Sequence, residues 1–182
     1  MRRPAFGIMT ALGTALAAAC VRGAPADGAS ATGDEPAAAT PVAVAEGRVP
    51  LTRLRAEPYS YTYGSGFVDS TQRIVRDTAT WAALWAQIHA RHGEQPPRPG
   101  FDPAREQLVL VALGRRATGG FTILLDSAVA SRDSLLIHVT TTAPGPRCGT
   151  TAALTEPVDV ARMPRVTLPA RFVTRATVTS CP

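Results

Sequence analysis

The sequence predicts an α+β fold, a mostly antiparallel β-sheet with one Trp-bearing amphipathic helix packed on it. Two observations predict this fold. Residues 81–88 carry apolar side chains at helical spacing, whereas about seven other short segments have the two-residue alternation or the unbroken apolar runs of strands. One helix among that many strands is typical of a domain with its helix on a sheet face.

The first twenty residues have the layout of an export signal. Arg2 and Arg3 precede the uncharged, mostly apolar stretch 5–19, which ends in small residues before Cys20. As a helix this stretch rises about 22 Å, short of the roughly 30 Å hydrocarbon core of a membrane, so a permanent span is not expected. We therefore expect residues 1–19 to be a signal peptide.

The sequence LAAAC at residues 16–20 resembles a bacterial lipobox, in which cleavage occurs before an acylated cysteine. The resemblance implies lipidation of Cys20 and a lipid anchor in a membrane. Ala17 stands where leucine is preferred, so ordinary cleavage after an Ala-x-Ala pattern stays open. Both routes place the mature protein in the cell envelope, outside the cytoplasm. Val21 is not the aspartate typical of inner-membrane retention, which favours an outer membrane, with a periplasmic or secreted protein as the alternative.

A tether is expected between this cysteine and the folded domain. Residues 20–50 are rich in Ala, Pro and Gly and contain no aromatic residue, so they cannot bury enough apolar area to offset the entropy of ordering. The globular domain is therefore expected at residues 51–182.

The first part of this domain is expected to hold two strands and the helix. Residues 59–63 alternate tyrosine with polar residues, and residues 72–77 form a second short candidate. The helix begins at Asp77 or Thr78 as N-cap and ends by Gly93, since the proline-rich stretch 94–100 prevents its continuation. Its apolar stripe has the spacing i, i+3, i+4 and i+7 and consists of Trp81, Leu84, Trp85 and Ile88.

Strands are expected in the remainder. The unbroken apolar run 107–113 indicates a central strand covered on both faces. Segments 121–127 and 134–142 alternate apolar and polar side chains, as half-buried strands do. Shorter candidates are residues 158–160, 166–168 and 171–178.

Net charge argues against a nucleic-acid partner. The chain has 19 basic residues, all of them arginine, and a formal charge of +5, which removal of Arg2 and Arg3 lowers to about +3. The arginines are scattered among fourteen acidic residues instead of forming a stripe with interleaved aromatics.

Cys148 and Cys181 form an even pair in a compartment that is expected to be oxidising, which favours a disulfide bond. Free thiols are one alternative. A metal pair is another, although two cysteines without histidines at ligand spacing make a poor zinc site.

The stretch GRRATGGF at residues 114–121 raises the question of a phosphate-binding loop. Such a loop requires a helix after its glycines, but the residues after Gly120 have the period of a strand. The glycines are therefore expected to serve a strand-to-strand connection that leaves Arg115 and Arg116 exposed at a turn, and no nucleotide is expected.

Nothing else indicates a cofactor. His89 and His92 share a helix without a third metal ligand, and are expected to be solvated residues beside the tryptophans; His138 has no nucleophile partner. Candidates for acid/base work are strand-edge carboxylates that solvation explains equally well, namely Asp102, Glu106 and Asp126. The protein is expected to be non-enzymatic, and a hydrolase with an unlocated site stays open.

A family resemblance covers roughly residues 70–175. It rests on the helix TWAALWAQI, Phe101–Asp102, the strand and turn QLVLVALGRRATGGFTILLDSAV, the stretch TTTAPGPRCGTTAAL, and the Thr-x-Pro at residues 155–157. Together these are similar to the C-terminal domain of PrcB-type protease complex subunits. Phe121 takes a place where tyrosine is frequent in that family.

The resemblance implies a surface lipoprotein that associates with a secreted or surface protease and supports its assembly or activity. It carries over no catalytic residue. A protein-interaction surface is expected on the loops, because loops on a rigid scaffold carry binding, and its candidate residues are Arg115, Arg116, Thr118, Gly119, Gly120 and Arg147. The alternative is an inhibitor-like regulatory module that inserts a loop into a protease cleft.

Overall fold

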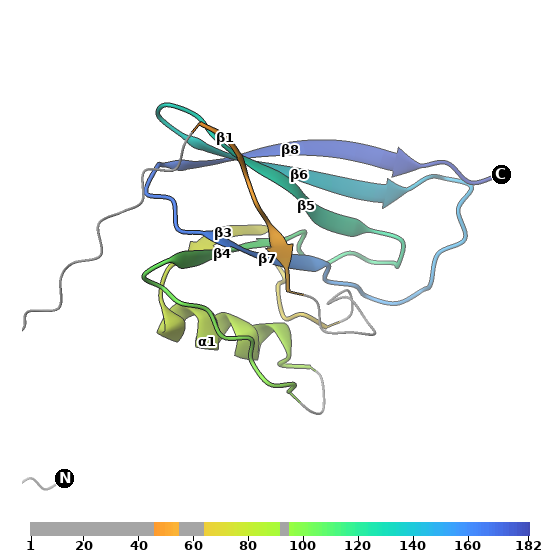
Figure 1. Cartoon of the computed structure of the whole chain (residues 1–182). Helices are drawn as coiled ribbons and strands as arrows, with labels where there is room; N and C mark the ends of the chain where they lie inside the picture. Colours follow the sequence, from red (N-terminus) through yellow and green to blue (C-terminus); the bar gives the residue numbers. More distant parts are fainter. Residues whose placement is uncertain (1–45, 55–63, 92–94) are drawn as a thin grey trace, which may run out of the picture. The chain divides into compact units, whose positions relative to one another are not determined.

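The structure, a computed structural model, describes residues 46–54, 64–91 and 95–182, which form two stacked four-stranded sheets and one helix (Figure 1). The outer sheet has the strand order β1 (Gly47–Val49), β5 (Thr122–Ala130), β6 (Leu135–Pro144) and β8 (Ala170–Thr179). The helix-covered sheet has the order β2 (Thr52–Arg53), β7 (Val158–Pro164), β4 (Glu106–Ala112) and β3 (Thr71–Val75). Helix α1 (Thr78–Ile88) packs on the face of this second sheet that points away from the outer sheet.

The predicted α+β class with mostly antiparallel strands is confirmed, but the expectation of a single sheet is wrong. All neighbouring strands pair antiparallel except β6 and β8, which are parallel. The chain changes sheets four times, between β1 and β2, between β4 and β5, between β6 and β7, and between β7 and β8. Alternation along one strand shows that one face is buried; it does not show which other strands share its sheet.

Strand β4 lies at the centre of the domain. Val109 and Val111 point into the core between the two sheets, whereas Leu108 and Leu110 point into the core beneath the helix. Every residue of β4 after Glu106 is buried, because apolar material covers both faces of the strand. The predicted central strand is confirmed.

Helix α1 begins at the predicted N-cap, Asp77, whose side chain accepts a hydrogen bond from the Thr80 N–H at 2.7 Å. It ends at Ile88 with His89 as C-cap, earlier than the predicted end at Gly93, which lies outside the described residues. Trp81 is fully buried and Trp85 is 1% exposed.

The two indoles fix the proline-rich segment that follows the helix. Trp81 Nε1–H donates to the Pro99 carbonyl at 2.7 Å, and Trp85 Nε1–H donates to the Pro96 carbonyl at 3.0 Å. Proline lacks an N–H but keeps its carbonyl, so this segment can accept hydrogen bonds without joining a sheet. The helix thereby holds the return of the chain toward β4.

Most of the other expected strands are present. The candidates at 72–77, 121–127, 134–142, 158–160 and 171–178 correspond to β3, β5, β6, β7 and β8. The candidate at 166–168 is wrong: Val166 is buried in the core between the sheets, but this short segment forms no strand. The expected signal peptide, Cys20, residues 20–45 of the tether and the strand at 59–63 lie outside the described residues. The expected end of the tether at residue 50 is wrong, because Gly47–Val49 form β1 of the outer sheet and Val49 is buried in the core. Within the described part of the chain, no helix is long and apolar enough to cross a membrane.

Candidate interaction surface

The connection between β4 and β5, residues 113–121, carries most of the predicted binding residues. The prediction that it joins two strands is confirmed, since β5 begins at Thr122. Gly114 has a φ of +80°, and a Cβ on it would lie 2.9 Å from both the Val68 oxygen and the Ser70 nitrogen. Glycine is required here because the connection runs against the backbone that leads into β3.

This connection is paired with the long loop between β6 and β7. Arg116 and Thr155 form an isolated antiparallel bridge, with backbone hydrogen bonds of 2.8 and 3.0 Å. The Thr155 hydroxyl donates to the Thr118 carbonyl at 2.8 Å, and the Gly119 N–H donates to the Thr151 carbonyl at 2.9 Å. Gly119 is buried, and a Cβ on it would collide with Thr151 Oγ1. The two loops therefore form one ordered surface.

Glu156 lies beneath this surface and is 1% exposed. Its Oε1 lies 2.7 Å from Arg115 Nη2 and 3.4 Å from Arg91 Nη1, and its Oε2 accepts from the Gly66 N–H at 2.8 Å. The Ser65 hydroxyl donates to the Glu156 backbone carbonyl at 2.6 Å.

Burial disfavours the ionised form of Glu156. The hydrogen bonds from Arg115 and Gly66 and the charges of Arg91 and Arg115 outweigh that effect and hold the pKa of Glu156 below its ordinary value. A carboxylate with this set of donors joins the β4–β5 connection to the segment before β3 and to the end of α1. Its geometry suits a structural role.

The expectation that Arg115 and Arg116 are exposed at a turn is wrong. The Arg115 side chain is 32% exposed and holds Glu156. Arg116 donates to the Leu113 carbonyl at 2.9 Å, and its guanidinium lies 5.8 Å from the centre of the Phe121 ring. Both side chains turn inward because a buried carboxylate and backbone carbonyls that accept hydrogen bonds lie within their reach. The local sequence does not show that these acceptors are nearby.

Asp159 is a second buried carboxylate, 5% exposed, and it links the two sheets. Its Oδ2 accepts from the Leu125 N–H at 2.8 Å and lies 3.3 Å from Arg53 Nε. Arg53 also donates to the Leu125 carbonyl at 2.6 Å. The β5–β6 pairing shifts register between Leu125 and Ser127. This irregularity therefore lies next to Leu125, the residue of β5 that Asp159 and Arg53 bind.

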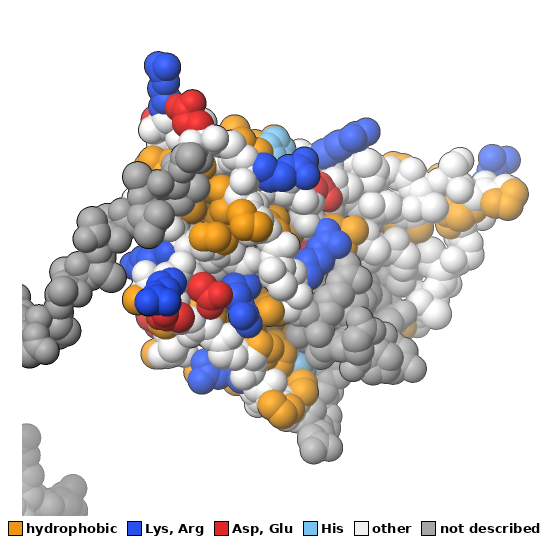
Figure 2. Space-filling view, in the orientation of Figure 1, with side chains coloured by type: hydrophobic (Ala, Val, Ile, Leu, Met, Phe, Trp, Pro, Cys, Tyr) orange, Lys and Arg blue, Asp and Glu red, His pale blue; other side chains and the backbone are white. Residues whose placement is uncertain are grey.

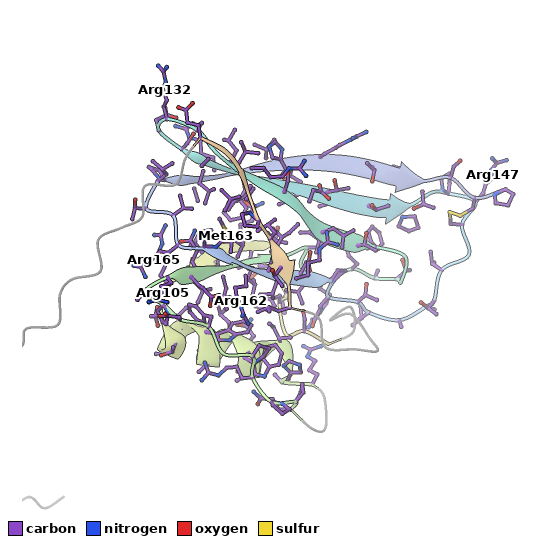
Figure 3. All side chains as sticks on the ribbon, in the orientation of Figure 1. Arg105, Arg132, Arg147, Arg162, Met163 and Arg165 are labelled. Carbon is purple, nitrogen blue, oxygen red and sulfur yellow. A yellow bond between two sulfur atoms is a disulfide. The ribbon has the colours of Figure 1, made fainter. Side chains whose placement is uncertain are left out.

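Arg147 lies apart from these groups, at the exposed tip of the β6–β7 loop. The predicted disulfide between Cys148 and Cys181 is present beside it, with a Cα–Cα distance of 5.1 Å (Figure 3). The Cys148 N–H donates to the Gly145 carbonyl at 3.0 Å, which closes a tight turn around Arg147. An open cavity of about 320 Å³ lies at this tip, lined by Gly145, Pro146, Arg147, Val178, Thr179, Ser180 and Cys181.

The six predicted binding residues are therefore divided between two places. Five of them belong to the paired loops, where Gly120 is exposed, Thr118 is half-buried and the others serve internal contacts. Arg147 is exposed at the disulfide tip.

The histidines differ from expectation. His89, predicted to be solvated, is 6% exposed. Its ring packs against that of Trp85, with 4.3 Å between ring centroids and a tilt of 49°, and its Nδ1 contacts the Trp85 carbonyl at 2.9 Å. It extends the tryptophan stripe by one helical turn, which the i+4 spacing from Trp85 indicates. His92 lies outside the described residues, and His138 lies half-buried on β6.

The predicted acid/base candidates make local contacts. The exposed Asp102 lies 3.8 Å from Arg105, Glu106 accepts from the Asp102 N–H at 3.0 Å, and Asp126 accepts from the Thr140 hydroxyl at 2.6 Å. Asp102 and Glu106 are thus neighbours at the start of β4, whereas Asp126 belongs to β5 of the outer sheet. Among the described residues, no group of three or more His, Cys, Asp or Glu side chains could hold a metal ion.

Sequence reasoning missed the two carboxylates that organise the loops, Glu156 and Asp159. For Asp159 the sequence does carry a signal, because this acidic residue lies within the mostly apolar segment VDVARM at residues 158–163. For Glu156 the signal is only its place between Thr155 and Pro157, within the Thr-x-Pro that carries part of the family resemblance.

The geometry defines a two-sheet domain with paired loops at one end. Residues 108–164 match the PrcB C-terminal family. The match runs from β4 to β7, includes both paired loops, and supports a PrcB-type C-terminal domain in this part of the chain. No curated protein and no solved structure matches the chain significantly.

Proposed function

We propose that this protein is a lipid-anchored, extracytoplasmic interaction domain without enzymatic activity, which serves as an accessory or stabilising subunit of a secreted protease. The observation that carries the proposal is the family match over residues 108–164, which includes the whole of the paired-loop surface. The contacts of Glu156 and Asp159 agree with a non-enzymatic role. Arginines and backbone N–H groups bind both carboxylates and thereby join separate segments of the fold.

Within the predicted surface, Arg147 is the side chain best placed to meet a partner. It is exposed, and the disulfide and the turn beside it limit the entropy lost when a partner orders the loop. Arginine is frequent at interface hot spots because its planar guanidinium pairs with carboxylates through two hydrogen bonds. Arg115 is a poor choice for mutation, because its loss would unpair Glu156 and disturb the fold.

A pull-down from envelope extract with the Arg147→Glu variant tests this assignment. We expect the wild-type protein to recover a protease and the variant to recover at least tenfold less. Arg132→Glu is the matched control, because Arg132 is exposed and lies on the β5–β6 turn at the opposite end from Arg147 (Figure 3). Equal recovery by all three proteins would remove Arg147 from the proposed contact, and recovery of no protease by the wild type would contradict the proposed function.

The anchor has its own test. Mass spectrometry of the mature N-terminus is expected to find acyl groups on Cys20 as the first residue. An unmodified Cys20, or a mature chain that begins elsewhere, would contradict lipid anchoring. The proposed protein-interaction role would still be tested separately by the pull-down.

An exposed arginine beside a disulfide also suits the alternative, a protease inhibitor that inserts this loop. Against it, the hydrogen bond from Cys148 to Gly145 places Arg147 in a tight turn, whereas a segment that adds to a partner's sheet edge has to be extended. Purified protein added to a secreted protease distinguishes the two. Loss of peptide hydrolysis favours inhibition, whereas protection from autolysis favours an accessory subunit.

A further inference from the structure

Strand β8 is an edge strand of unusual length for this molecule. Three other strands lie at sheet edges, and they have three residues in β1, two in β2 and five in β3, against ten in β8. Within the described residues, β8 pairs with β6 alone, so its second edge presents backbone N–H and C=O groups. Proteins commonly keep such edges short because an edge strand is a template for pairing with another chain.

The side chains of β8 also differ from those of a protected strand. The strand contains no buried residue. Four large apolar side chains are exposed in the described part of the chain, and two of them, Val173 and Val178, lie on β8. In Figure 2 basic side chains project from the upper margin, where the outer sheet lies.

Two arginines flank Val173 on one face of this strand. Phe172 packs against the core between the sheets, so the alternate residues Arg171, Val173 and Arg175 lie on the outer face. Arg171 and Arg175 are four residues apart, a separation of about 13 Å along a strand. Strand β8 carries no acidic residue that would neutralise them.

This pattern disfavours two of the registers in which a second copy of the chain could pair with β8. In an antiparallel self-pairing centred on Val173, each Arg171 would lie opposite the other copy's Arg175. In one centred on Arg175, the two Arg175 side chains would lie opposite each other. Like charges directly opposite across strands are destabilising, whereas opposite charges stabilise the pair.

We propose that the free edge of β8 binds an extended segment of a partner protein that adds a strand to the outer sheet. The segment carries carboxylates four residues apart, opposite Arg171 and Arg175, and an apolar residue midway between them, opposite Val173. Backbone hydrogen bonds along the edge supply affinity, and the two arginines select acidic segments. The inference rests on the proposed function only in that the partner is a protein.

A blocked peptide of sequence Thr-Glu-Thr-Val-Thr-Glu-Thr tests the inference with the purified full chain. We expect it to bind at least tenfold more tightly than the same peptide with lysine in place of both glutamates. The double variant Arg171→Glu/Arg175→Glu is expected to reverse this preference. A third peptide, with N-methyl groups that block its edge-pairing N–H positions, is expected not to bind.

Hydrogen exchange supplies a second readout. Peptide binding is expected to slow exchange of β8 amides and to leave the amides of α1, on the far face of the helix-covered sheet, unchanged. Equal binding of the glutamate and lysine peptides, no binding at millimolar concentration, or a β8-dependent dimer in sedimentation would each overturn the inference. A wild-type chain that recovers a protease from envelope extract but does not bind the peptide would overturn the β8 inference and leave the proposed function standing.

Discussion

The two sheets of this domain are stabilised in different ways. In the helix-covered sheet, β4 contributes alternate side chains to two cores, one on each of its faces. The outer sheet contributes only its inner face, and its longest edge strand has no buried residue. Most of the packing energy therefore lies in one sheet, and most of the accessible backbone edge lies in the other.

The outer sheet has other attachments in place of a second core. The disulfide ties the end of β8 to the β6–β7 loop, and Asp159 of β7 binds the Leu125 N–H of β5 across the sheets. These are point attachments, unlike the continuous packing beneath the helix. The difference predicts that substitutions in the helix-covered sheet cost the most stability and that the outer face tolerates change.

The largest effect is expected for Trp85→Ala. Trp85 is 1% exposed, contacts Trp81 and His89 and donates to Pro96, so its truncation opens a cavity beneath the sheet and frees the proline-rich segment. A loss of about 3–5 kcal/mol in the free energy of unfolding is expected for such a truncation, measured by urea denaturation. Val178→Ala, at a residue 67% exposed, is the control and should change it by less than about 0.5 kcal/mol. Comparable losses in the two variants would show that the helix does not form a core.

Removal of the disulfide is expected to have the next largest effect. The bond spans 33 residues, so the chain-entropy estimate of its contribution is about 3–4 kcal/mol. In the Cys148→Ser/Cys181→Ser variant, amide exchange should accelerate first at the C-terminal end of β8, while exchange in β4 should follow global unfolding. Uniform acceleration throughout the chain would show that the bond does not act locally on the outer sheet.

Much of this fold could be predicted because burial on one face or both leaves a pattern in each strand. The unbroken run in β4, the alternation in β6 and the helical stripe of α1 each reflect the surface that covers them. The division into two sheets could not be predicted, because β6 pairs in parallel with β8 although a long loop and the strand β7 lie between them in the chain. Local alternation is identical for either arrangement.

The candidate site was less accessible from sequence because its key contacts join distant segments. Glu156 is bound by Gly66, about ninety residues earlier, and by Arg115, about forty residues earlier. The sequence places Arg115 and Arg116 in a connection between strands, but it does not show that their side chains turn inward, because Glu156 is not their neighbour in the sequence. Arg147 lies next to Cys148, whose disulfide was predicted, and the structure places it exposed at the loop tip.

Glu156→Gln is expected to cost less than removal of the disulfide. The amide keeps the shape but leaves Arg115 without its anionic partner, and since Arg115 is partly exposed, the cost is expected to be about 2–3 kcal/mol, below the usual range for a fully buried pair. Glu46→Gln is the control, because Glu46 and its partner Arg132 are both exposed, and a change of less than about 0.5 kcal/mol is expected.

The pH dependence of the Glu156→Gln effect follows from the direction of its pKa. The pKa of Glu156 is lowered from its ordinary value of 4.5, so the ionised carboxylate stabilises the fold above that value, and this stabilisation is lost as the pH falls through the folded-state pKa. The difference in unfolding free energy between wild type and variant should be constant near pH 7 and shrink at lower pH. A difference that grows on acidification would contradict the assigned ion pair.

The smallest effect is expected on the outer face of β8. Arg171→Glu/Arg175→Glu changes two exposed side chains without disturbing a core, so the free energy of unfolding should change by less than about 0.5 kcal/mol. The same variant is predicted to lose binding of the glutamate peptide. Binding can therefore be removed at this strand without loss of stability, whereas a substitution at Trp85 changes stability. A large loss of stability in urea denaturation would mean that the two arginines stabilise the fold. The outer face of β8 would then not tolerate change, and the expected difference between the helix-covered sheet and the outer sheet would be wrong.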